Sequence, residues 1–168
     1  IRTLIEHGET DLMSCVSTLN RTIYKNARRI KTDKALTFAL INYQGGQLKF
    51  VGQHEEVLAV RKNGQVQRVG TMHLGFPIGL EEEIAQWVAE ATVTLEPGDG
   101  IVLYTDGITE AENIHKELYG IQRLCDVISE NWNQSAEEIK RAAIDDIIRF
   151  IGGQKVYDDL TLIILKQT

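Results

Sequence analysis

Several residue types and patterns are scarce in this sequence. It contains two cysteines and two prolines among 168 residues, no apolar run of transmembrane length and no recognisable signal peptide. Cys15 and Cys125 each fall at an apolar position of a helical pattern, so we expect both to be buried thiols in a reducing cytoplasm. No serine or cysteine nucleophile motif is present, which argues against covalent catalysis through either residue.

Positive charge is scarce as well. The formal net charge is -6 at pH 7, and the basic cluster that stands out is Arg28-Arg29 with Lys31. This balance argues against binding to a nucleic-acid backbone. We expect the cluster to be the basic end of a helix, where cations interact favourably with the helix dipole. The histidines show no ligand spacing to one another, which argues against a histidine zinc site.

What the sequence does contain fits one domain with a sizeable core, since 43% of its 168 residues are hydrophobic. Residues 1–7 look like the tail of a helix that Gly8 stops, so we expect the chain to begin inside a domain. Thr10 is expected to cap the next helix, whose apolar residues recur at helical spacing. They are Leu12, Cys15, Val16, Leu19, Ile23 and Ala27.

From Leu36 onward the pattern indicates a meander of short antiparallel strands. A Gln-Gly-Gly-Gln turn separates the first two strands, and Asn63-Gly64, a strong hairpin signal, separates the last two. The strands are expected at 36–43, 48–52, 57–61 and 66–69. A loop at 74–80 follows, because Gly and Pro recur there.

The second half of the chain mixes helical and strand patterns. Residues 81–92 fit both, because their apolar residues keep helical spacing and also alternate as in a strand. The helix opened by the Ser135–Glu138 capping box is expected to end at Gly152-Gly153. The remaining expected elements are a turn at 96–99, a strand at 101–104, a helix at 120–132 and a final strand at 160–165.

Two acidic sites adjoin buried strands in opposite senses. Asp106 follows the strand at 101–104, whereas Asp158-Asp159 precedes the final strand. If these strands are antiparallel neighbours, the end of one lies beside the start of the other. Asp106 and Asp158 would then converge, and two such carboxylates repel each other unless a cation lies between them. Hard cations such as Mg²⁺ or Mn²⁺ prefer oxygen ligands of this kind, which points to metal-dependent chemistry on phosphate.

Three segments taken together resemble one protein family. They are the stretch from Leu95 to Ala111 (LEPGDGIVLYTDGITEA), the pair Tyr119-Gly120 before a helix, and Asp158-Asp159-Leu160-Thr161. This ordered set resembles the sporulation-E-type (SpoIIE-like) serine phosphatases of bacteria, a branch of the metal-dependent type 2C protein phosphatases. The resemblance extends from about Leu4 to Lys166, with looser matches at 52–58 and 75–80.

The resemblance implies an α+β fold, an antiparallel β-sandwich flanked by helices. It favours a strand at about 88–95. It also implies that Asp106 and Asp158 are the catalytic metal ligands of a centre holding two Mn²⁺ or Mg²⁺ ions. Asp159 is assigned to the same metal site, holding either a metal-associated water or the loop itself.

The implied function is hydrolysis of phosphoserine or phosphothreonine in a phosphorylated anti-anti-sigma-type protein of a bacterial partner-switching pathway. We expect a cytoplasmic domain, without nucleic-acid or direct membrane contact, that belongs to a larger protein with an upstream sensor. The family's other metal-binding segment, an aspartate-glycine motif before a Gly-His-Gly-like loop, has no counterpart here. We therefore expect residues 1–168 to be a single phosphatase-like domain that lacks its N-terminal strands and binds metals poorly.

Other interpretations of the same residues remain open. The missing motif would also suit a catalytically inactive phosphatase fold that docks a partner. A phosphoaspartyl enzyme or receiver needs a second acid two positions after its aspartate, where this chain has Ile108, and its parallel sheet disagrees with the meander. An aspartate before glycine is often a turn residue. Glu110 is expected to pair with a loop amide or a lysine, and His54 to be structural.

Overall fold

The computed structural model describes Glu6, Gly8 and residues 10–168. The helix tail expected over residues 1–7 therefore lies, except for Glu6, outside the described residues. The chain forms two compact units: residues 1–54 with 70–94, and residues 55–69 with 95–168. Each unit contains an antiparallel sheet and at least one helix, which confirms the α+β class with antiparallel strands. Within the described residues, no helix is long and apolar enough to cross a membrane.

In the first unit, helix α2 (Leu12–Arg29) begins one residue later than the sequence suggested. Its N-cap is Asp11 rather than Thr10, because the Asp11 carboxylate accepts hydrogen bonds from the N–H groups of Met13 (3.2 Å) and Ser14 (3.1 Å). The basic pair Arg28-Arg29 lies in the last turn, as predicted.

The three-stranded sheet of this unit has the order β1 (Leu40–Gln44), β2 (Gln47–Val51) and β5 (Glu90–Thr94). The first strand is shorter than expected, since Leu36 forms only an isolated bridge with Ile78. The ambiguous segment divides into a short 3-10 helix, η1 (Ala85–Trp87), and strand β5. The strand favoured by the family resemblance is thus confirmed.

A buried asparagine connects helix α2 to the loop after residue 78. The Asn20 side chain is fully buried among the apolar residues of α2, a position at which the hydrophobic pattern gave no signal. Its amide nitrogen donates to the carbonyls of Glu81 and Glu82 (2.9 and 3.0 Å), and its amide oxygen accepts from the Gly79 N–H (2.8 Å). Every polar atom of this side chain is thereby used, which is what its burial requires.

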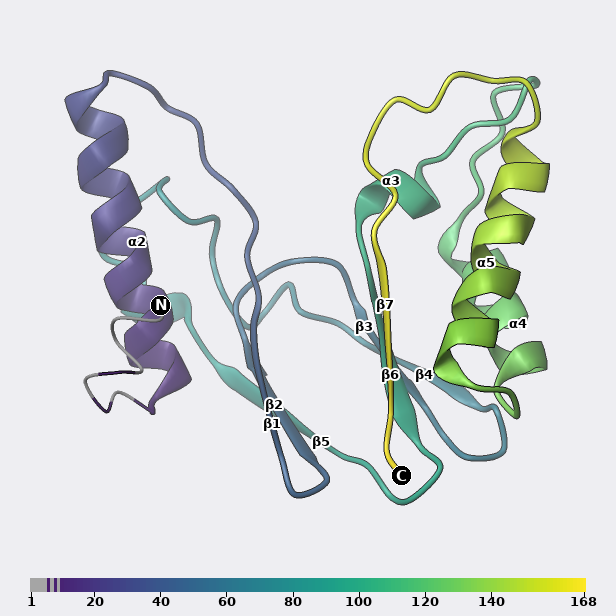
Figure 1. Cartoon of the computed structure of the whole chain (residues 1–168). Helices are drawn as coiled ribbons and strands as arrows, with labels where there is room; N and C mark the ends of the chain where they lie inside the picture. Colours follow the sequence, from purple (N-terminus) through teal and green to yellow (C-terminus); the bar gives the residue numbers. More distant parts are fainter. Residues whose placement is uncertain (1–5, 7, 9) are drawn as a thin grey trace. The chain divides into compact units, whose positions relative to one another are not determined.

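The second unit has a four-stranded sheet of order β4 (Val66–Val69), β3 (Val57–Val60), β6 (Gly100–Tyr104) and β7 (Leu162–Lys166). Helices α4 (Ile121–Asn131) and α5 (Ala136–Ile151) lie together beside it (Figure 1). The capping box predicted at Ser135 and Glu138 is present. The sheet and both helices share one core of buried residues, which includes Leu58, Val102, Tyr104, Leu124, Ile128, Ile139, Ala143 and Ile147.

The turn before β6 is bonded to the residues that follow β3 and to the residue that follows β7. Asp99, only 4% exposed, accepts hydrogen bonds from Arg61 Nη1 (2.9 Å) and from the N–H groups of Lys62 (2.8 Å) and Glu96 (3.1 Å). Burial raises the pKa of this carboxyl, but the Arg61 bond and the two N–H bonds outweigh burial and hold the pKa below its ordinary value. The Asp99 carbonyl also accepts from the Gln167 N–H, 2.8 Å away.

We predict that Asp99→Ala lowers the free energy of unfolding by about 1–3 kcal/mol, because it leaves the N–H groups of Lys62 and Glu96 without their acceptor. Glu96→Ala, at an exposed position of the same turn, is the matched control and should change it by less than about 0.5 kcal/mol. Urea unfolding of both variants measures the difference. Equal midpoints for the two variants would contradict this account of the turn.

Candidate metal centre

The end of β6 lies beside the start of β7, as the positions of the two acidic sites predicted. The two strands lie side by side (Figure 1) and are antiparallel. Tyr104 at the end of β6 pairs with Leu162 at the start of β7. Asp106 is the first residue of the one-turn helix α3 (Asp106–Thr109), which is separated from β6 by Thr105 alone. Asp158 and Asp159 lie in the segment that leads into β7. The segments that carry Asp106 and Asp158 therefore meet at one end of the sheet.

The contact between these segments is so close that it requires a glycine after Asp106. A Cβ atom on Gly107 would lie 2.5 Å from the Asp159 carbonyl oxygen and 3.4 Å from the Asp158 Cβ. The first distance is too short for a real contact, so any side chain would push the Asp158-Asp159 segment away. The Asp-Gly sequence is therefore more than a turn signal, since the glycine allows the two acidic segments to touch.

Both aspartate side chains are exposed, and each is oriented by its own backbone. Asp106 Oδ1 accepts from the Gly107 N–H (2.9 Å), and Asp158 Oδ1 accepts from the Asp159 N–H (2.7 Å). These bonds hold one oxygen of each carboxylate, and two adjacent carboxylates of this kind favour a hard cation. The described residues nevertheless contain no group of three His, Cys, Asp or Glu that could hold an ion. The donor chemistry thus fits part of a metal site.

A small pocket of about 80 Å³ adjoins the pair. Gly107 and Asp158 line it together with Glu110, Glu112 and Lys155. Apart from Lys155, the charged residues of this lining are acidic, so the pocket adds to the negative potential around the two aspartates.

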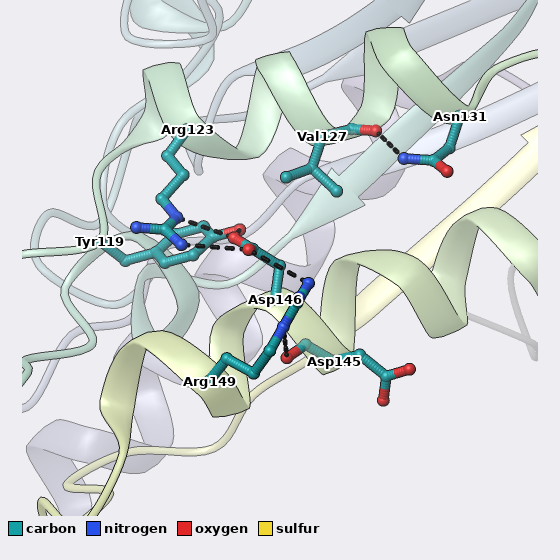
Figure 2. A network of polar contacts seen from close by, with 7 residues as sticks. All are labelled: Tyr119, Arg123, Val127, Asn131, Asp145, Asp146 and Arg149. Carbon is teal, nitrogen blue, oxygen red and sulfur yellow. Dashed lines mark hydrogen bonds and ion pairs between the residues drawn. The ribbon is translucent and has the colours of Figure 1, made fainter.

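A second polar cluster lies between α4 and α5, and the sequence pattern gave no sign of it (Figure 2). Asp146 of α5 accepts from Tyr119 Oη (2.9 Å) and from Arg123 Nε (2.7 Å) and Nη2 (3.0 Å), while Arg149 Nη2 lies 3.5 Å away. The Arg123 bonds are the main reason that the pKa of the Asp146 carboxyl is lowered. The neighbouring Asp145 is exposed.

This cluster fixes the far end of the loop that begins at α3. The N–H of Tyr119 donates to the Ala111 carbonyl (2.8 Å), and the N–H of Gly120 donates to the Thr109 carbonyl (2.9 Å). Because the Tyr119 hydroxyl is bonded to Asp146, the segment after Asp106 is anchored on α5 as well as on the sheet.

The other candidates have contacts typical of structural residues. His54 Nδ1 lies 3.0 Å from Thr37 Oγ1, and the His54 N–H donates to Thr71 Oγ1 (3.0 Å), in agreement with the structural role expected for it. Cys15 and Cys125 are both buried, as predicted, and no disulfide joins them. Burial raises the pKa of the Cys125 thiol, which disfavours the thiolate that a nucleophile needs.

A comparison with known protein families matches residues 1–168 to the family of stage II sporulation protein E (SpoIIE). Protein IcfG of Synechocystis sp. is 28% identical over 129 residues, which are 76% of this chain and 20% of that protein. The phosphoserine phosphatase RsbU of Bacillus subtilis is 39% identical over 75 residues, or 44% of this chain and 21% of that protein. The chain thus spans about a fifth of the length of these curated relatives.

Solved structures of the same fold come from three bacteria. The RsbU and RsbW domains of Rv1364c from Mycobacterium tuberculosis give a TM-score of 0.72 at 19% identity, covering 99% of this chain and 44% of that one. The SiaA-PP2C domain of Pseudomonas aeruginosa gives a TM-score of 0.66 at 18% identity, and the match covers 92% of this chain and 70% of that one. The manganese-presoaked SpoIIE phosphatase domain of Bacillus subtilis gives a TM-score of 0.60 at 19% identity, and the match covers 99% of this chain and 70% of that one. These likenesses confirm the type 2C phosphatase fold.

We predict that Gly107→Ala lowers the free energy of unfolding by about 1–3 kcal/mol, because the new methyl group forces the Asp159 carbonyl to move. Gly153→Ala is the control, since a Cβ there meets no atom within 4 Å. Thermal unfolding of both variants gives the comparison. If the two proteins melt at the same temperature, the close approach at Gly107 is not real.

The lowered pKa of Asp146 predicts a pH-dependent contribution to stability. The ionised carboxylate stabilises the fold above the ordinary aspartate pKa of about 3.9, and this contribution is lost as the pH falls through the lowered pKa of the folded state. Asp146→Asn should therefore lower the free energy of unfolding by about 1–3 kcal/mol at pH 7 and by progressively less towards pH 3. Urea unfolding across this range measures it, with exposed Asp145→Asn as the control. If the loss of unfolding free energy in Asp146→Asn does not change with pH, the ionised Asp146 carboxylate is not what stabilises the fold.

Proposed function

Because the chain belongs to the family of stage II sporulation protein E (SpoIIE), we propose that it is a metal-dependent phosphatase domain acting on phosphoserine or phosphothreonine in a protein. The proposal rests on one observation above all, the antiparallel pairing of β6 with β7 that brings the Asp106 and Asp158 segments into contact. A merely structural pair of turns would not need two exposed carboxylates at the same place.

In the proposed site, Asp106 and Asp158 are metal ligands, and Asp159 contributes to the same site. The SpoIIE and type 2C phosphatases are metal-dependent, with Mn²⁺ or Mg²⁺ as the ion. When bound, such ions neutralise phosphate oxygens and activate water. The chain's own residues hold the ligands: backbone N–H groups orient both carboxylates, and Gly107 lets their segments touch.

We propose further that residues 1–168 form a single phosphatase-like domain whose metal centre needs more than these aspartates. Two observations support this. The described residues contain no group of three potential ligands, and the family's aspartate-glycine segment before a Gly-His-Gly-like loop has no counterpart among the 168 residues. A complete two-metal centre thus requires at least one further carboxylate.

For the substrate, we propose a phosphorylated anti-anti-sigma-type protein in a partner-switching pathway. The relative RsbU is named a phosphoserine phosphatase, and one structural neighbour carries RsbU and RsbW domains. The chain's net charge of -6 argues against a nucleic-acid backbone as the substrate, and we propose that the domain acts in the cytoplasm. We also propose that a sensor domain upstream controls it.

A second candidate is a catalytically inactive phosphatase fold that docks a partner. The incomplete ligand set among the described residues favours it. It gives no reason, however, for two exposed carboxylates to be held together across β6 and β7. Turnover by the complete gene product distinguishes the two candidates.

We predict that Asp106→Asn or Asp158→Asn, made in the complete protein, lowers manganese-dependent phosphate release from a phosphoserine protein by about 100-fold or more, because each removes a ligand charge. Release of inorganic phosphate measures this effect. Asp145→Asn, on the exposed face of α5, is the control and should retain full activity.

Near-normal turnover in either ligand variant would exclude these residues as metal ligands. The 168-residue chain alone should bind Mn²⁺ weakly in calorimetry, since its ligand set is incomplete. Tight binding of two ions by this chain would show that the remaining ligand lies within it.

A further inference from the structure

Thr105 stands at the point where strand β6 becomes helix α3, and its backbone serves both elements. Its N–H donates to the Thr161 carbonyl (3.2 Å), which continues the pairing of β6 with β7 by one residue. Its carbonyl, however, accepts from the Ile108 N–H (3.0 Å) in the first turn of α3. In a regular antiparallel pair that carbonyl would accept from the Thr161 N–H instead. The start of α3 therefore takes one acceptor out of the ladder.

The hydroxyl of Thr105 replaces the missing acceptor. Thr105 Oγ1 accepts from the Thr161 N–H (3.1 Å) and donates to the Asp159 carbonyl (2.9 Å). A hydroxyl is suited to this double role because it carries one donor and two acceptor sites. It makes no capping bond to α3, although Thr105 is the N-cap residue. Both hydrogen bonds of the hydroxyl therefore go to residues 159 and 161, in the segment that leads into β7.

We propose that Thr105 is the positioning residue of the metal site, a hydroxyl clip that holds the Asp158-Asp159 segment against the Asp106 segment. Thr105 precedes Asp106 directly, and its two bonds lie on either side of Leu160, at Asp159 and Thr161. Any shift of the segment along β6 would break at least one of them. In this proposal the clip fixes the separation of the Asp106 and Asp158 carboxylates without touching metal or substrate. The inference rests on the function proposed above.

The direct test is Thr105→Val in the complete protein, because valine keeps the shape of threonine and replaces its hydroxyl with a methyl group. We expect the dissociation constant for Mn²⁺, measured by calorimetry, to rise about 10-fold, as is typical for residues that orient metal ligands. Thr105→Ser retains the hydroxyl and should stay within about 3-fold of the parent protein. Hydrogen exchange of the peptide containing Thr161, measured without metal, should accelerate in the valine variant and not in the serine variant.

Thr161→Val is the matched control, since it makes the same chemical change in the opposite strand. The Thr161 side chain is exposed, and its N–H, which contacts Thr105, is retained. Unchanged Mn²⁺ affinity in Thr105→Val, or equal losses in the valine and serine variants, would overturn the proposal. If the valine variant does not fold, Thr105→Ala takes its place and must show the loss that serine does not.

The outcomes separate this inference from the proposed function. If the parent protein binds Mn²⁺ but releases no phosphate, while valine weakens binding and serine does not, the clip stands and the phosphatase activity is refuted. If Asp106→Asn and Asp158→Asn bind Mn²⁺ like the parent protein, the metal site itself is refuted, and the clip's positioning role falls with it.

Discussion

The pairing of β6 with β7 is the constraint on which the rest of this structure depends. Two strands far apart in the sequence run antiparallel, so the residues after one lie beside the residues before the other. The buried Asp99 lies at one end of this pairing, where its carboxylate accepts a hydrogen bond from Arg61 and its carbonyl accepts one from the Gln167 N–H. At the other end the same register places Gly107, the residue after Asp106, against the Asp158-Asp159 segment. A shift by one residue would turn every side chain of β7 to the opposite face.

The acidic pair is held from several directions, although its carboxylates are exposed. Gly107 permits the close approach of the Asp106 and Asp158 segments, and the Thr105 hydroxyl forms hydrogen bonds to residues 159 and 161. The Asp146 cluster anchors the loop that leaves α3. A metal site benefits from such support, because mutual repulsion would otherwise separate two unliganded carboxylates. The fold therefore supplies rigidity, while the exposed oxygens remain available to an ion and a phosphate group. This division of roles agrees with a family in which the metal carries the chemistry.

The sequence predicted the features that depend on local pattern and on strand direction. The capping box at Ser135 follows from short-range signals, and the approach of the segments that carry Asp106 and Asp158 follows from antiparallel geometry. It could not predict Asn20, Asp146 or the Thr105 hydroxyl, because each acts on groups distant in the chain. A polar residue in a helical or strand pattern gives no sign of a partner that only the tertiary fold provides. The cap at Asp11 was missed for a simpler reason, since Thr10 and Asp11 are both good N-caps.

The central claim is that Asp106 and Asp158 bind the same metal centre because β6 and β7 bring them together. Anomalous diffraction from crystals of the complete gene product soaked in Mn²⁺ tests it most directly. The account predicts a manganese peak in contact with carboxylate oxygens of both aspartates. A peak that contacts neither of them, or manganese bound elsewhere while both side chains are ordered, would contradict it.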